Sequence, residues 1–150
     1  MQHTKKGEEL TKLIVETFRL NGAIIEAGDA LVKDLGITSA RWQVLACMVN
    51  GPATVSEIAR LRGLSRQNVQ RIANRLATDG FIESLENPAH RRAKLFQLTP
   101  KGQETMAEVA KRQKHWANRA SEALDLEMLT TVVSQMKVYI QAIGDTGPTP

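Results

Sequence analysis

Residues 54–76 constrain the fold more than any other stretch, because they combine two helix starts with a tight turn. Thr54 and Glu57 have the spacing of a capping box, in which each side chain binds a free amide at the helix start. Gly63 predicts the end of that short helix, and Ser65 is a suitable cap for the next one. The pattern therefore predicts two helices that cross closely around a tight turn, as in a helix-turn-helix.

The second of these helices has two chemically different faces. An apolar stripe at the i, i+3, i+4 and i+7 positions is formed by Val69, Ile72, Ala73 and Leu76. The other face has no acid before Asp79, and its Arg, Asn and Gln side chains match the edges of guanine and adenine in the major groove. The candidates for base and phosphate contacts are Ser65, Arg66, Gln67, Asn68, Gln70, Arg71, Asn74 and Arg75. The alternative is a solvated polar face in an ordinary helical hairpin.

Positive charge is concentrated around this region. Residues 54–102 contain nine Lys and Arg against four Asp and Glu, whereas the rest of the chain contains eleven against twelve. The net charge of +4 therefore arises from the segment that contains the helix-turn-helix. Because neutralisation of phosphates requires such a cluster, we expect double-stranded DNA as the partner.

A change of period after residue 80 predicts a wing, meaning a β-hairpin beside the second helix. Residues 81–86 and 93–98 each approximate strand alternation, and the polar segment between them suits an exposed tip. At this tip, His90, Arg91 and Arg92 are candidates for contact with a minor groove or a phosphate.

Two long apolar helical patterns flank this unit, so we expect a mainly α fold with a small β-wing. The expected parts of a single domain 1–150 are dimerisation helices at 8–33 and 103–143, a winged helix-turn-helix lobe at 38–102 and a mobile tail at 144–150. The long helices can hardly bury their apolar faces on a small lobe alone. A two-fold homodimer on a pseudo-palindromic DNA site is therefore predicted, with a monomer carrying a helical cap as the alternative.

Several function classes are not expected from the remaining residues. A single cysteine, Cys47, fits a reducing compartment and is expected to be a buried, inert thiol, with a redox sensor as the alternative. The start of the chain lacks the apolar region of a signal peptide and no apolar run has the length of a membrane span, so we expect a cytoplasmic protein without membrane contact. No metal-ligand spacing or nucleophile–base pair is evident, so neither a cofactor nor an enzyme is expected.

The chain resembles the MarR family of bacterial transcription regulators from about residue 8 to 143. The resemblance is carried by the order and spacing of four motifs: Thr38-x-x-x-Trp42-x-Val44-Leu45, Thr54-Val-Ser-Glu-Ile-Ala, Gly63-Leu-Ser-Arg-Gln and Arg91-Arg92-Ala93-Lys94-x-x-x-Leu98-Thr99-Pro100-Lys101-Gly102. It implies a dimeric repressor or activator, here expected to be a repressor, that a small aromatic or phenolic ligand releases from DNA. It also implies a pocket where the dimerisation helices meet the DNA-binding lobe. Trp42 is a candidate for its aromatic wall, with a core position as the alternative, and Arg41 is a candidate for its anion partner.

The wing departs from the family pattern at one position. Relatives usually carry Asp-x-Arg there, in which the Asp steadies the Arg that enters the minor groove, whereas this chain has His90-Arg91-Arg92. Arg92 matches the groove-entering Arg, but an imidazole cannot hold it as a carboxylate would. We therefore expect a looser wing, or a phosphate contact from His90 itself.

Two other function classes are compatible with the same pattern. In the first, the winged helix docks a protein partner and the basic face is incidental. In the second, the chain binds a small molecule and has no function on DNA. Steep salt dependence of DNA affinity would disfavour the first class. A ligand-dependent melting shift without any operator would support the second.

Overall fold

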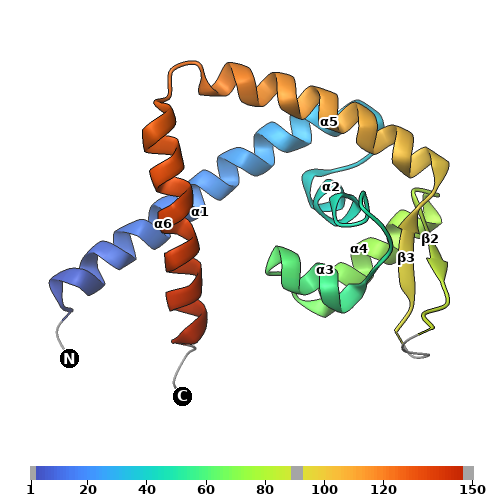
Figure 1. Ribbon diagram of the computed structural model, residues 1–150, viewed down its shortest axis with the longest axis horizontal. Coiled ribbons are helices and arrows are strands. Elements are labelled where there is room, and N and C mark those ends of the chain that lie inside the picture. Colours follow the sequence, from blue (N-terminus) through green and yellow to red (C-terminus); the bar gives the residue numbers. More distant parts are fainter. Residues whose placement is uncertain (1–2, 89–92, 147–150) are drawn as a thin grey trace. The chain divides into compact units, whose positions relative to one another are not determined.

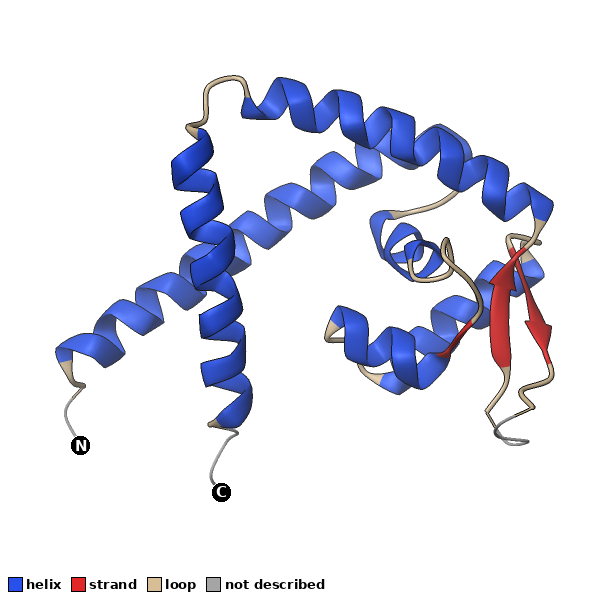
Figure 2. Cartoon of the chain, in the orientation of Figure 1, coloured by secondary structure: helices blue, strands red, loops and turns tan. Residues whose placement is uncertain are grey.

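The computed structural model describes residues 3–88 and 93–146 (Figure 1). The chain divides into two compact units, residues 1–112 and 113–150. Helices make up most of the described residues, and short strands lie in the first unit (Figure 2). The predicted fold class, mainly α with a small β-wing, is therefore confirmed.

The first unit begins with two helices that are tied together. Its first elements are α1 (Lys5–Val32), the 3-10 turn η1 (Lys33–Leu35) and α2 (Ser39–Ala46). The side chains of Thr4 and Thr38 cap α1 and α2 by accepting backbone hydrogen bonds. Ser39 N donates to Asp29 Oδ1 at 2.6 Å, and Ser39 Oγ donates to the Ile25 carbonyl at 3.1 Å. These two bonds hold the start of α2 against α1.

A winged helix follows in the same unit. Its elements are β1 (Ala53–Thr54), α3 (Val55–Arg62), α4 (Arg66–Thr78), β2 (Ile82–Leu85) and β3 (Leu95–Leu98). The strands form one antiparallel sheet in the order β1-β3-β2, with Ile82 opposite Leu98 and Leu85 opposite Leu95. The hairpin predicted from strand alternation is present. The sequence pattern did not reveal β1, because two residues are too few to show a period.

One apolar core joins these elements. Among its completely buried side chains are Leu45, Ile58, Val69, Leu76 and Val109, contributed by α2, α3, α4 and α5. The stripe predicted on α4 lies entirely within this core. Since that stripe occupies one side of α4, the core determines which side chains the other side of the helix presents to solvent.

The last two helices are α5 (Pro100–Ser121) and α6 (Leu126–Asp145). Pro100 takes the first position of α5, and Thr99 caps it by accepting from Gly102 N at 3.2 Å. Helix α6 lies in the second unit and has no buried residue. Among the described residues, no helix is both long enough and apolar enough to cross a membrane.

Two helix ends differ from the sequence predictions. The sequence pattern of residues 38–49 predicts a helix with Val49 on its inner side, but α2 ends at Ala46 and Val49 is 53% exposed. The cause is the following turn, in which Gly51 has a φ of 138° and precedes a proline that disfavours helical backbone. Helix α6 continues through Gly144 to Asp145, although the sequence predicts a mobile tail from residue 144 onwards. Gly144 lacks the positive φ of a glycine helix end.

Candidate nucleic-acid interface

Local hydrogen bonds fix the geometry of the helix-turn-helix. Thr54 Oγ1 accepts from Glu57 N at 3.2 Å and Glu57 Oε2 accepts from Thr54 N at 2.7 Å, so the predicted capping box is present. The hydrogen bonds that Thr54 N and Thr54 Oγ1 donate to Glu57 Oε2 hold the pKa of Glu57 below its usual range. Gly63 ends α3 with a φ of 64°, which favours glycine. Ser65 then caps α4 by accepting from Asn68 N at 3.2 Å.

The exposed face of α4 carries the side chains that the sequence singled out for DNA contact. Asn68 is half-buried, and the other seven candidates on this helix and its cap are exposed: Ser65, Arg66, Gln67, Gln70, Arg71, Asn74 and Arg75. The helix itself contains three arginines and no acid. The structure therefore brings all of these candidates together on one polar, positively charged surface, which we call the reading face.

Two hydrogen bonds run along the reading face. Arg71 Nη2 donates to Asn68 Oδ1 at 3.1 Å. Gln70 Nε2 donates to Asn74 Oδ1 at 2.8 Å. Four of the candidates are therefore held in two pairs, each about one helical turn apart.

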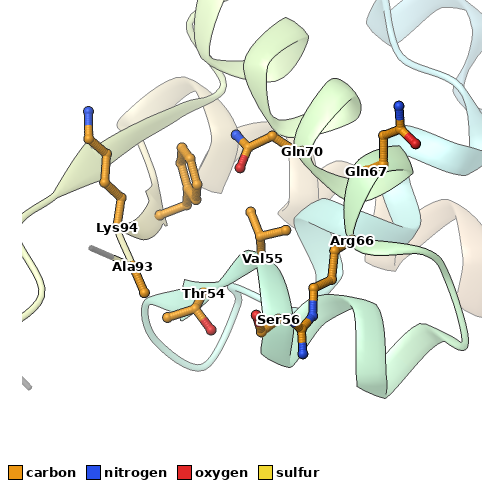
Figure 3. Close-up of a pocket in the computed structure, with 9 residues that line it drawn as sticks. Thr54, Val55, Ser56, Arg66, Gln67, Gln70, Ala93 and Lys94 are labelled. Carbon is orange, nitrogen blue, oxygen red and sulfur yellow. The ribbon is translucent and has the colours of Figure 1, made fainter. Parts of the chain in front are cut away.

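A groove of about 530 Å³ lies between α3, α4 and the start of β3 (Figure 3). Gln70 and Arg66 reach it from α4, and Figure 3 shows the Arg66 side chain extending towards Ser56 of α3. Gln67, Thr54 and Lys94 complete its polar lining. The sequence did not reveal Thr54, Ser56 and Lys94 as interface candidates, because the start of α3 and the root of the wing meet only in the folded chain. Their hydroxyl and ammonium groups suit contacts to phosphate oxygens.

The predicted tip of the wing is only partly described. His90, Arg91 and Arg92 lie outside the described residues, so their DNA contacts stay predictions. The strands on either side are paired, and Gln97 Nε2 donates to Glu83 Oε1 across them at 2.7 Å. This pairing fixes where the chain leaves and re-enters the hairpin.

A second cavity, of about 390 Å³, lies among α1, α2 and α3. Apolar and polar side chains share its lining, which consists of Asn21, Ile24, Ile25, Gly28, Ser39, Trp42, Gln43, Ala46 and Arg62. Arg41, the predicted anion partner, is not among them, because its guanidinium pairs with Asp79 at 3.0 Å. Arg62 is the arginine within this lining. The sequence could not show this, since Arg62 reaches α2 only through tertiary packing.

Arg62 is fixed in this cavity by α2. Its Nε donates to the Gln43 carbonyl at 3.1 Å and to Cys47 Sγ at 3.2 Å. Cys47, predicted to be buried, is half-buried, because it lies just beyond the end of α2. Within the part of the chain that the structure describes, neither Nη of Arg62 has a hydrogen-bond partner. The two Nη groups are therefore available to an anion in the cavity.

Comparisons with known proteins agree with this geometry. The model of the MarR family matches residues 35–93. An uncharacterized protein of Mycobacterium tuberculosis is 32% identical over 142 residues, which cover 95% of this chain and 99% of that protein. The transcriptional repressor MprA of Escherichia coli is 30% identical over 118 residues, which cover 77% of this chain and 65% of MprA.

Solved structures show the same fold. The transcriptional repressor CouR, bound to a 23-mer DNA duplex, superposes with a TM-score of 0.76 at 24% identity, and the match covers 93% of this chain and 99% of CouR. The resemblance inferred from the four sequence motifs is thus confirmed by the family model and by the fold. Residues 35–93 therefore match a family of transcription regulators, which are not enzymes, and the chain shares the fold of those regulators.

Proposed function

We propose that this regulator represses transcription as a homodimer that binds a pseudo-palindromic operator through the reading face of α4. The observation that carries the proposal is the composition of that face, which has three arginines, four amide side chains and no acid, opposite a fully buried stripe. Guanine and adenine edges and phosphates are the groups that such side chains bind. In this arrangement α4 enters the major groove.

The dimer is supported by exposed apolar side chains on two helices. Phe18 of α1 is 72% exposed, and Ile140 of α6 is 69% exposed. Soluble monomers rarely leave a series of such residues in water. A second copy that covers them would place two reading faces about one duplex turn, or a multiple of it, apart.

The wing supplies the second set of DNA contacts in this proposal. Arg91 and Arg92 reach a minor groove or phosphates, and His90 contacts a phosphate in place of the family's Asp. Lys94 supports this assignment, because it lies just beyond that tip and lines the groove beside α4. A wing next to the reading face suits simultaneous contact with adjacent grooves.

Release from DNA is assigned to a small aromatic carboxylic acid in the cavity among α1, α2 and α3. Trp42 offers an aromatic wall, Ile24 and Ile25 offer apolar contacts, and the free Nη groups of Arg62 suit a carboxylate. A thermal-melting series with benzoate-type acids tests this step. Arg62→Met should abolish the shift, whereas Arg60→Met, which changes a neighbouring arginine outside the lining, should retain it.

The reading-face proposal is tested by selecting bound sequences from a random duplex pool and measuring affinity against salt concentration. Arg71→Ala should weaken specific binding by about 1–3 kcal/mol and relax one position of each half-site. Arg66→Ala should weaken all duplexes alike and lower the salt slope by about one unit, since a phosphate contact carries no base information. A bound pool without a two-fold motif would contradict the proposal.

Repression is tested separately, by placing the selected operator within a promoter. Addition of the protein should lower transcription from that promoter, and a rise in transcription would contradict repression.

A further inference from the structure

The two hydrogen-bonded pairs on the reading face have unequal partners. Arg71 and Gln70 are long, with forked ends, and each donates to the shorter amide of an asparagine, Asn68 or Asn74. Asn68 is half-buried and fixed at the first turn of α4, where its own backbone N–H donates to the Ser65 cap. Asn68, the shorter side chain of that pair, is therefore a fixed support for Arg71.

We propose that Asn68 and Asn74 are positioning residues, which orient Arg71 onto a guanine and Gln70 onto an adenine within each half-site. The inference rests on the proposed entry of α4 into the major groove. It goes beyond that function because it assigns base identity and separates base-reading side chains from their supports.

The donors that remain on Arg71 match guanine. Asn68 takes one hydrogen of Nη2, so the second hydrogen of Nη2 and those of Nη1 stay free to point outward. A guanidinium end of this kind donates two parallel hydrogen bonds to O6 and N7 of guanine. Holding the arginine before DNA arrives lowers the conformational entropy lost on binding.

The groups that remain on Gln70 match adenine. Its Nε2 donates one hydrogen to Asn74, which leaves the second hydrogen and the Oε1 acceptor. These two groups complement N7 and the N6 amino group of adenine. Asn74 supports this reader from the following turn.

Gln67 provides the contrast on the same helix. It is exposed, and among the described residues its amide has no hydrogen-bond partner. A side chain without support must lose its rotamer freedom on contact with DNA. Gln67→Ala is therefore the matched comparison, because it removes an amide and its own DNA contact from the reading face and leaves both pairs intact.

The test is a pair of double-mutant cycles, read as base preference at each operator position after selection from a random pool. Asn68→Ala should lower only the guanine preference, by about three- to tenfold, which is the effect of freeing one rotamer-rich side chain. When Asn68→Ala is combined with Arg71→Ala, the guanine preference should fall no further than in Arg71→Ala alone. Asn74→Ala should lower only the adenine preference, and it should have no further effect when it is combined with Gln70→Ala. Gln67→Ala should weaken binding through the loss of its own contact and should leave these two preferences unchanged.

Asn68→Asp separates positioning from structural support. The aspartate keeps an acceptor for Arg71, so the guanine preference that is lost in Asn68→Ala should be restored in Asn68→Asp. Repulsion between the new charge and phosphates should lower the affinity for all duplexes alike. An unchanged guanine preference in Asn68→Ala, or additive effects with Arg71→Ala, would overturn the inference and leave the proposed function standing. A wild-type protein that selects no motif at all would instead overturn the proposed function itself.

Discussion

Arg41 of α2 and Asp79, which follows the last residue of α4, form an ion pair of 3.0 Å in which both side chains are only 23% exposed. The same Asp79 oxygen also accepts from Arg75 Nε at 3.1 Å. Lys101 Nζ donates to the Asp79 carbonyl at 2.7 Å. Side chains from three helices therefore converge on the residue that ends α4, and they fix the direction in which the reading face points.

The two arginines on Asp79 should differ in their effect on stability. Arg41→Met keeps the apolar stem but leaves the partly buried carboxylate with one partner fewer, so we expect a loss of about 1–2 kcal/mol in the free energy of unfolding. Arg75→Met removes a pair whose arginine is 62% exposed and should cost less than about 0.5 kcal/mol. Urea unfolding at pH 7 measures both. Equal losses would show that burial does not set the strength of these pairs.

Two glycine-to-alanine changes within helices should have opposite effects. A Cβ at Gly102 would collide with the Phe81 carbonyl oxygen and lie 3.3 Å from Leu98 Cδ2. Gly102→Ala should therefore destabilise the protein by roughly 1–3 kcal/mol, despite the better helix propensity of alanine. At Gly22 a Cβ would meet nothing within 4 Å, so Gly22→Ala should stabilise by about 0.5–1 kcal/mol. Thermal unfolding of both variants measures these changes in stability. A stabilised Gly102→Ala would contradict the close packing of α5 against Phe81, the residue before β2.

Local sequence rules predicted the winged helix well. The capping box of Thr54 and Glu57, the end of α3 at Gly63 and the cap at Ser65 all involve residues within a few positions of one another. Such bonds depend on side-chain type and spacing alone. The buried stripe of α4 followed equally from its period, because one face of that helix meets a single core.

Features that depend on distant segments could not be predicted. The arginine that lines the cavity is Arg62 and not Arg41, and that difference depends on how α3 and α4 pack on α2. The role of Lys94 in the groove beside α4 likewise requires the wing to fold back onto the start of α3. A periodic pattern shows which face of one helix or strand is buried, but it does not show which distant segments meet in the folded chain.

Acid should weaken the contact between α5 and η1. Arg112 Nη1 and Nη2 donate to the two oxygens of Asp34 at 2.6 and 2.9 Å, and this hydrogen bonding lowers the pKa of Asp34. Hydrogen bonding from the same arginine lowers the pKa of Glu108. A carboxyl group with a lowered folded-state pKa stabilises the fold above its unfolded pKa and loses that contribution as the pH falls through the folded value.

We therefore expect Asp34→Asn to be less stable than the wild type at pH 7 and to approach it as the pH falls below about 4, the ordinary value for an aspartate, and then through the lowered folded pKa of Asp34. Urea midpoints measured between pH 2 and pH 7 test this convergence. Glu9→Gln is the control at pH 7, since the Glu9–Lys12 pair is 71% exposed on both sides and should contribute little. A constant gap between Asp34→Asn and wild type at every pH would mean that the charge of Asp34 is not what stabilises the contact.

The oligomeric state should depend on exposed apolar residues of α1 and α6. Phe18→Asp and Ile140→Asp each place a charge where the proposed second copy would bury a side chain, so each should shift the protein towards monomer by tenfold or more in dimer dissociation constant, equivalent to about 1.4 kcal/mol or more. Sedimentation velocity across a concentration series measures the shift. Leu61→Asp is the control, because Leu61 is 64% exposed but lies on α3, outside the helices assigned to dimerisation. If Leu61→Asp dissociated the protein while Phe18→Asp and Ile140→Asp did not, the interface would lie on the winged helix and two reading faces could not bind adjacent half-sites in the proposed way.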